Sequence, residues 1–82
     1  MAEQYTEKQG QYLAFIESYM TMHGKAPAEA ELQRFIGATP PAIHQMILKL
    51  EEKRYISRNP GQARSIKLLI DQEELPRLKR QR

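Results

Sequence analysis

Lysine and arginine side chains gather in the second half of this 82-residue chain, where they could bind a polyanion. Residues 1–33 hold two lysines against five glutamates, a net charge of −3, whereas residues 34–82 carry +6. Cations collected at one end of a molecule attract phosphate-rich partners such as nucleic acids. The same residues could instead only keep the surface solvated. The cations at issue are Lys49, Lys53, Arg54, Arg58, Arg64 and Lys67.

Three helices must position these side chains, and the first is predicted between Thr6 and Gly24. Thr6 and Gln9 have the spacing of a capping box, in which each side chain accepts a hydrogen bond from the backbone N–H of the other residue. Gly24 can adopt the left-handed conformation that ends a helix. Apolar residues recur between them at helical spacing, namely Leu13, Ile16 and Met20.

The next two predicted helices are separated by a tight turn. The second runs from about Ala28 to Ile36 and ends at Gly37, although Ala28 supplies no capping oxygen. The third begins at Thr39-Pro40, because threonine is a good N-cap and proline suits the first helical position. Its inward side chains are Ile43, Ile47 and Leu50, and its outward face holds Pro41, Ala42, His44, Gln45, Leu48, Lys49 and Glu52.

Alternating residues then predict a β-hairpin with strands at 55–58 and 65–68, joined by turn residues Pro60-Gly61. In this register Ile56, Ile66 and Leu68 face the helices, while Arg58, Arg64 and Lys67 reach outward. The pattern fails after Ile70, so we expect a mobile charged tail over residues 71–82. The fold class is therefore α+β, a winged helix-turn-helix over residues 1–70.

A helix-turn-helix followed by a basic hairpin favours double-stranded DNA as the partner. The third helix would enter the major groove, and the hairpin, or wing, would lie over the sugar-phosphate backbone or dip into the minor groove. His44 and Gln45 can hydrogen-bond base edges, and Arg58, Arg64 and Lys67 can contact phosphates. In the alternative interpretation the tip is only a turn, the strand cations discourage edge pairing, and Lys53 only complements the helix dipole.

The sequence from Thr6 to about Leu69 resembles the DNA-binding domain of the LexA family of bacterial repressors. The hairpin motif carries most weight because its spacing places both strands. The resemblance implies a winged-helix transcriptional regulator, most simply a repressor. The shared motifs are Thr6-x-x-Gln9, Gly24-x-x-Pro27, Leu32-Gln33-Arg34-x-Ile36-Gly37, Thr39-Pro40-x-Ala42, Leu50-x-x-Lys53-x-x-Ile56 and Gly61-x-x-Arg64-x-Ile66-x-Leu68-Leu69.

The chain also departs from the family pattern. Where the family reads DNA with an Asn and a Glu-Glu pair, this chain has Pro41 and His44-Gln45, so the family's operator is not carried over. The turn between Gly37 and Thr39 looks one residue shorter than the family's. The chain ends soon after Glu73-Glu74-Leu75-Pro76, which resembles the linker to the family's self-cleaving serine–lysine domain. We therefore expect no self-cleavage and no enzymatic activity.

These arguments together predict a set of DNA-contacting residues. A chain this small could bind as a homodimer, because a single domain offers limited contact area. The runner-up function is a protein-interaction module for an acidic partner, with Leu48 or Tyr55 as an exposed anchor. The predicted DNA-contacting residues are Thr39, Pro41, Ala42, His44, Gln45, Lys49, Lys53, Arg58, Asn59, Gly61, Gln62, Arg64 and Lys67.

Other classes of function find little support in the sequence. There is no cysteine, and two histidines are too few for a zinc site, so we expect no metal, cofactor or small-molecule ligand. No serine has a histidine and an acid in a triad-like pattern. We interpret Tyr12, Phe15 and Tyr19 as packing residues rather than a stacking platform for single strands. No apolar run reaches membrane-spanning length and no signal peptide is visible, so we expect a soluble, cytoplasmic protein.

Overall fold

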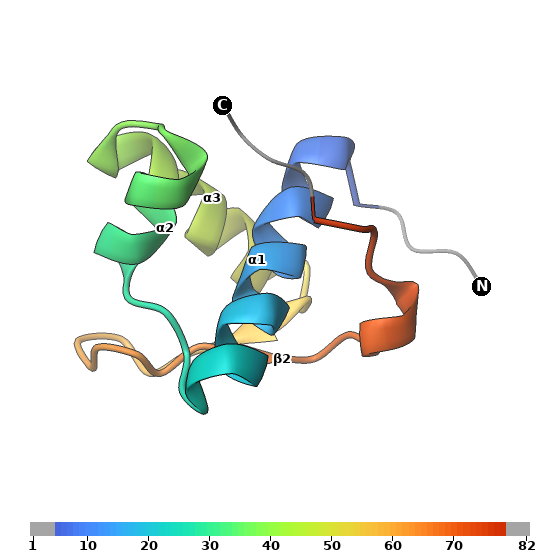
Figure 1. Ribbon diagram of the computed structural model, residues 1–82. Helices are drawn as coiled ribbons and strands as arrows, with labels where there is room; N and C mark the ends of the chain where they lie inside the picture. Colours follow the sequence, from blue (N-terminus) through green and yellow to red (C-terminus); the bar gives the residue numbers. More distant parts are fainter. Residues whose placement is uncertain (1–4, 79–82) are drawn as a thin grey trace.

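Three helices and a two-stranded hairpin form the described part of the chain, residues 5–78, in the computed structural model. The elements are α1 (Glu7–His23), α2 (Glu29–Ile36), α3 (Pro40–Glu52), β1 (Ile56–Ser57), β2 (Lys67–Leu68) and a 3-10 turn, η1 (Gln72–Glu74). In Figure 1, α1 runs through the middle, α2 and α3 lie on one side, and the hairpin crosses below. This is the winged helix-turn-helix that the sequence predicts.

The helix ends follow the predicted local chemistry. The Gln9 backbone N–H donates to Thr6 Oγ1 at 3.1 Å, and the Thr6 N–H donates to Gln9 Oε1 at 2.9 Å, which completes the capping box of α1. Gly24 ends this helix with a φ of 73°. At the start of α3, the Ala42 N–H donates to Thr39 Oγ1 at 3.3 Å. Local sequence therefore suffices to begin and end these helices.

The start of α2 is supported differently from what the sequence suggests. Ala28 stands at the N-cap and has no side-chain oxygen, but its own backbone N–H donates to Glu31 Oε1 at 2.7 Å. This is the reciprocal half of a capping box, made by the residue at the third helical position. Glu31 therefore stabilises the start of the helix that Ala28 cannot cap.

The hydrophobic core lies between the three helices and the hairpin. From α1 it takes Leu13 and Ile16, neither of which is exposed to solvent. The predicted inward face of α3 is confirmed, because Ile43, Ile47 and Leu50 are fully buried. Because these three residues hold one face of α3 in the core, the opposite face of the helix is open to solvent.

The wing strands are shorter than predicted. Ile56 pairs with Leu68 and Ser57 with Lys67, and residues 58–66 connect them. Hydrogen bonds between Asn59 and Ser65 replace the strand ladder: the Asn59 N–H donates to Ser65 Oγ at 2.9 Å, and that hydroxyl donates back to the Asn59 carbonyl at 3.1 Å. A side chain thus closes the loop where backbone pairing had been expected.

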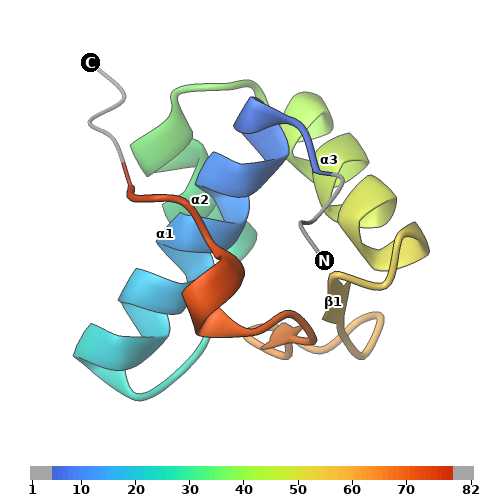
Figure 2. The same ribbon diagram turned by 90° about the vertical axis from the view of Figure 1, so that its right-hand side faces the viewer.

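The segment after the wing lies along α1, as Figure 2 shows. Gln11 Nε2 donates to the Arg77 carbonyl at 3.0 Å, the Tyr5 hydroxyl donates to the Glu74 carbonyl, and Leu75 packs against the core. Residues 71–78, which the sequence places in a mobile tail, therefore contact the rest of the described chain, because their carbonyls accept hydrogen bonds from Tyr5 and Gln11. The remaining tail cations, Lys79, Arg80 and Arg82, lie outside the described residues.

Close approach at Gly10 allows this arrangement. A Cβ atom at this position would lie 2.8 Å from Tyr5 Cε1 and 2.9 Å from Pro76 Cγ. Glycine inside a helix costs about 1 kcal/mol of stability relative to alanine. At this position the missing side chain leaves room for Tyr5 and Pro76 to lie against α1. Within residues 5–78, none of the helices is long and apolar enough to span a bilayer.

Replacing Ile47 tests the phase of α3. The Ile47→Ala variant should lose about 2–5 kcal/mol of unfolding free energy, because a fully buried side chain is removed from the core. Leu48→Ala is the matched control, since Leu48 is 37% exposed and a surface change costs about 0.5 kcal/mol or less. Urea denaturation measures both. Equal stabilities of the two variants would show that the helical phase is wrong.

Gly10→Ala tests the docking of residues 71–78. The added methyl group cannot fit between Tyr5 and Pro76, so we expect the segment to move off α1 and trypsin to cut faster after Arg77. Met22→Ala, at a position 78% exposed on the same helix, should leave the cleavage rate unchanged. Identical digestion of wild type and Gly10→Ala would contradict the docking.

Candidate nucleic-acid interface

One face of α3 is presented to solvent from its first residue. Thr39, Pro41 and Ala42 are exposed at the N-terminal end, as are His44 and Gln45 in the next turn. Farther along, the predicted contacts Lys49 and Lys53 are exposed as well. The first two turns thus form a narrow, uncovered helix end of the kind that fits the major groove.

His44 is held by an acidic residue of the neighbouring helix. Its Nδ1 lies 3.3 Å from Oε2 of Glu29, the first residue of α2, and both side chains are about half exposed. This contact restrains the imidazole between α2 and α3. When the ring is neutral and Nδ1 carries the proton, Nε2 is an acceptor rather than a donor. The contact therefore affects which bases His44 could recognise.

The tip of the wing is a compact turn closed by its own side chains. Pro60 precedes Gly61, which has a φ of 80°, and the Gln62 N–H donates to the Asn59 carbonyl at 3.0 Å. These are the features of a type II turn. Asn59 Nδ2 also donates to Gln62 Oε1 at 3.1 Å. Both polar side chains are exposed, but contact with another molecule would have to compete with the bond between them.

Two of the three wing cations do not reach outward as predicted. Arg58 donates through Nε to Glu51 Oε1 at 3.0 Å, and its side chain is only 16% exposed because it lies along α3. Arg64 also turns back onto the helices. Lys67 is exposed, as expected. Both arginines turn back because acidic residues on the helices face the hairpin. The alternation of residues within the strands does not reveal those acids.

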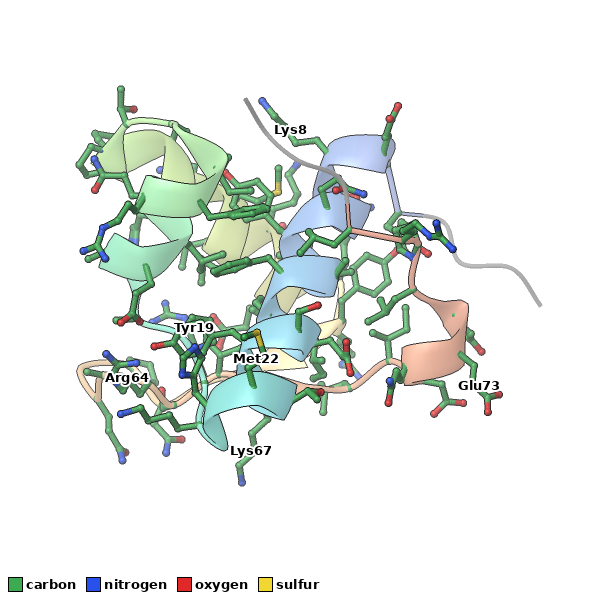
Figure 3. All side chains as sticks on the ribbon, viewed as in Figure 1. Lys8, Tyr19, Met22, Arg64, Lys67 and Glu73 are labelled. Carbon is green, nitrogen blue, oxygen red and sulfur yellow. The ribbon has the colours of Figure 1, made fainter. Side chains whose placement is uncertain are left out.

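Arg64 has the most extensive set of partners of the wing cations. Its Nη1 donates to Glu31 Oε1 at 2.9 Å and its Nη2 to Glu31 Oε2 at 2.8 Å, which makes a bidentate ion pair. Nη1 also lies 3.2 Å from the Tyr19 hydroxyl and from the Ala26 carbonyl. Figure 3 shows Arg64 and Tyr19 at the end of the molecule where the hairpin passes α1. The guanidinium thus joins the wing to α1, to α2 and to the connector between them.

The local backbone and electrostatics agree with this role. Arg64 has a φ of 56°, a left-handed conformation that an arginine keeps only when its surroundings hold it. Hydrogen bonds from Arg64 and from the Ala28 N–H lower the pKa of the Glu31 carboxyl to about 2. Glu31 therefore stays ionised under ordinary conditions and holds the arginine in place.

Sequence reasoning missed Glu31 and Tyr19 as parts of this region. From the sequence, Glu31 is only one of five glutamates in residues 1–33, and Tyr19 is interpreted as a packing residue. They lie 33 and 45 positions from Arg64 along the chain, so no local spacing connects the three. The available signal was chemical: an acid at the third position of a helix without a capping side chain.

Acid should weaken the contact between wing and helices. Because the pKa of Glu31 is about 2 in the folded protein and 4.5 in its ordinary state, the ion pair stabilises the fold fully above pH 4.5. That stabilisation is lost as the pH falls toward 2. Glu31→Gln keeps the oxygen that accepts from Ala28, so it should melt below wild type at pH 6, and the gap should close near pH 2.

Glu29→Gln is the matched control for this measurement, because it removes the same charge from the same helix end. Thermal melts from pH 2 to pH 7 compare the three proteins. A wild-type advantage over Glu31→Gln that stays constant with pH would contradict the assignment of the ion pair.

Comparisons with known proteins agree with this geometry. A family model described as the LexA DNA binding domain matches residues 2–65. The LexA repressor of Thermosipho melanesiensis is 39% identical over 70 residues, which cover 85% of this chain and 35% of that protein. The LexA repressor of Thermosipho africanus is 39% identical over 64 residues, covering 78% and 32%, respectively.

A more distant relative matches the same region. The LexA repressor of Staphylococcus aureus is 32% identical over 68 residues, which cover 82% of this chain and 33% of that protein. The chain thus spans about a third of the length of the curated relatives it matches. Because the family model covers most of the sequence, this chain belongs to the LexA DNA-binding domain family.

Proposed function

We propose that this protein binds double-stranded DNA with sequence specificity and acts as a transcriptional repressor. The observation that supports this most directly is the uncovered N-terminal half of α3, with Pro41, Ala42, His44 and Gln45 exposed on it. A helix can approach base edges only where neighbouring elements leave it free. In this chain one face of α3 is buried in the core, and the opposite face is exposed to solvent.

Gln45 is the residue we propose as the main direct reader of sequence. Its amide offers both a donor and an acceptor, which match the N7 and N6 atoms of adenine in the major groove. His44, held by Glu29, would present Nε2 as an acceptor to an amino group of adenine or cytosine when neutral. Pro41 has no N–H to offer. Site preference therefore depends on the second turn of α3.

The wing and the rest of α3 would supply affinity. Lys49, Lys53 and Lys67 are exposed and can neutralise phosphates, which contributes binding energy without base preference. Arg58 is largely occupied by Glu51. For Arg64 we propose a positioning role: it holds the turn of Asn59, Gly61 and Gln62 near the start of α2, from where the tip can reach the minor groove. To bind a phosphate, the Arg64 guanidinium would have to divide its N–H groups between the phosphate and Glu31.

Repression and pairing extend the proposal to the whole protein. The relatives are LexA repressors, and the chain matches about a third of their length. A single domain buries a limited area on DNA, so we propose that two copies occupy adjacent half-sites. Selection from a random duplex library tests both points. An enriched palindrome supports the pair, a lone half-site indicates a monomer, and no enrichment refutes sequence-specific binding.

The alternative function, a protein-interaction module, is not favoured. One of its two expected anchors is unavailable, because Tyr55 is 9% exposed and packs edge-on against Tyr5. Leu48 is the other, and at 37% exposure it stands among polar side chains of α3. The family match is to a DNA-binding domain.

Gln45→Ala should relax base preference at one position rather than weaken binding evenly. Loss of a bidentate contact removes about 1–3 kcal/mol of discrimination against the wrong base pair. Gln72→Ala, an exposed glutamine in η1, is the matched control and should leave the selected site unchanged. Parallel selections with wild type and both variants measure the effect. An unchanged preference in Gln45→Ala would assign specificity to the wing or to DNA shape.

A further inference from the structure

The start of α1 and the exposed side of α3 share a surface hollow. Its rim includes Lys8 from the first turn of α1, with Gln45 and Lys49 from α3. Ala42 forms part of the same lining, and Tyr12 lies at its α1 side. Gln45 and Lys49 are also predicted DNA contacts, so the hollow is continuous with the proposed binding surface. Sequence reasoning did not include Lys8 in that surface.

The charge of this hollow has one sign. Lys8 and Lys49 are both exposed, and no acidic residue lines the hollow in the described part of the chain. The ion pairs found within residues 5–78 involve His44, Arg58 and Arg64, and neither of these two lysines. Figure 3 shows the Lys8 side chain extending from α1 away from the core. An anion in the hollow would therefore meet two uncompensated ammonium groups.

The spacing along α3 relates the hollow to the groove. Ala42, Gln45 and Lys49 occupy positions i, i+3 and i+7, so they form one stripe on the helix. The sugar-phosphate backbone borders the groove, so Lys49, one turn beyond Gln45 on this stripe, can reach it when Gln45 faces base edges. Ala42 is short enough for the backbone to come close. Lys8 stands across the hollow from this stripe.

We infer that Lys8 and Lys49 bind the same stretch of sugar-phosphate backbone, so that the DNA footprint extends onto the first turn of α1. The occupant is a phosphodiester of the duplex that α3 enters. This inference rests on the proposed function and adds a contact to it. The positive end of the α1 dipole lies beside the same phosphates and acts in the same direction. Because the contact is to backbone, Lys8 contributes affinity and registration but no base preference.

The experiment measures duplex binding by the full chain across a salt series. The proteins are wild type, Lys8→Ala, Lys8→Arg and Lys25→Ala, each tested on the selected site and on an unrelated duplex. Lys25 is the control because it is an exposed lysine just beyond the opposite end of α1. Each neutralised phosphate is expected to add about 0.9 to the magnitude of the slope of log K against log[salt].

Lys8→Ala should bind both duplexes several-fold more weakly than wild type, with a slope smaller by about 0.9. The ratio of the wild-type to the Lys8→Ala association constant should fall by about threefold between about 50 and about 200 mM salt. Lys8→Arg should restore binding, and the selected site should not change. Lys25→Ala should keep the wild-type slope.

Other results overturn the inference in distinct ways. A Lys8→Ala slope equal to that of wild type removes Lys8 from the footprint while the proposed function stands. Equal losses in Lys8→Ala and Lys25→Ala show a general charge effect rather than a local contact. Failure of wild type to bind any duplex, even at low salt, refutes the proposed function and the inference together.

Discussion

The wing has little stiffness of its own, and the bidentate ion pair between Glu31 and Arg64 gives it a position. Its strands are two residues long, and a short hairpin in isolation is marginally stable. Glu31 also completes the start of α2 by accepting from the Ala28 N–H. One carboxylate thus links the initiation of α2 to the placement of the wing.

Burial of α3 imposes the second constraint on the proposed DNA surface. Ile43, Ile47 and Leu50 anchor the helix in the core and leave the opposite face open. The residues on that face differ in whether their side chains already have a hydrogen-bond partner. Gln45 is exposed, with no partner in the described residues, whereas His44 is held by Glu29. Recognition by this chain would then depend more on Gln45, with the helix ends and lysines supplying backbone contacts.

The segment after the wing shows how a single glycine changes the outline of a small domain. Gly10 lets residues 71–78 lie against α1, where Gln11 binds the Arg77 carbonyl and Leu75 reaches the core. Residues beyond the hairpin are therefore in contact with the helices. The segment that carries η1 lies on the side of α1 away from α2 and α3 (Figure 1).

The local features of the helices were predictable from the sequence. Capping residues such as Thr6 and Thr39, the ending at Gly24, and the inward phase of Ile43, Ile47 and Leu50 all depend on neighbours within one or two turns. The turn at Pro60-Gly61 is of the same kind. The outward face of α3, which carries the proposed base-reading contacts, follows directly from that phase.

The sequence by itself determined the order of the elements, their faces and the sign of their charge. Only the tertiary structure decided where the long side chains go. Arg58 and Arg64 are predicted to reach outward, but both turn to acids on the helices. Tyr55 is buried, and the segment after Ile70, although largely exposed, contacts α1 through the Arg77 carbonyl. The physical reason is distance along the chain: Arg64 meets Glu31 across 33 residues, a meeting that depends on how α2 and the hairpin pack and not on the spacing within either.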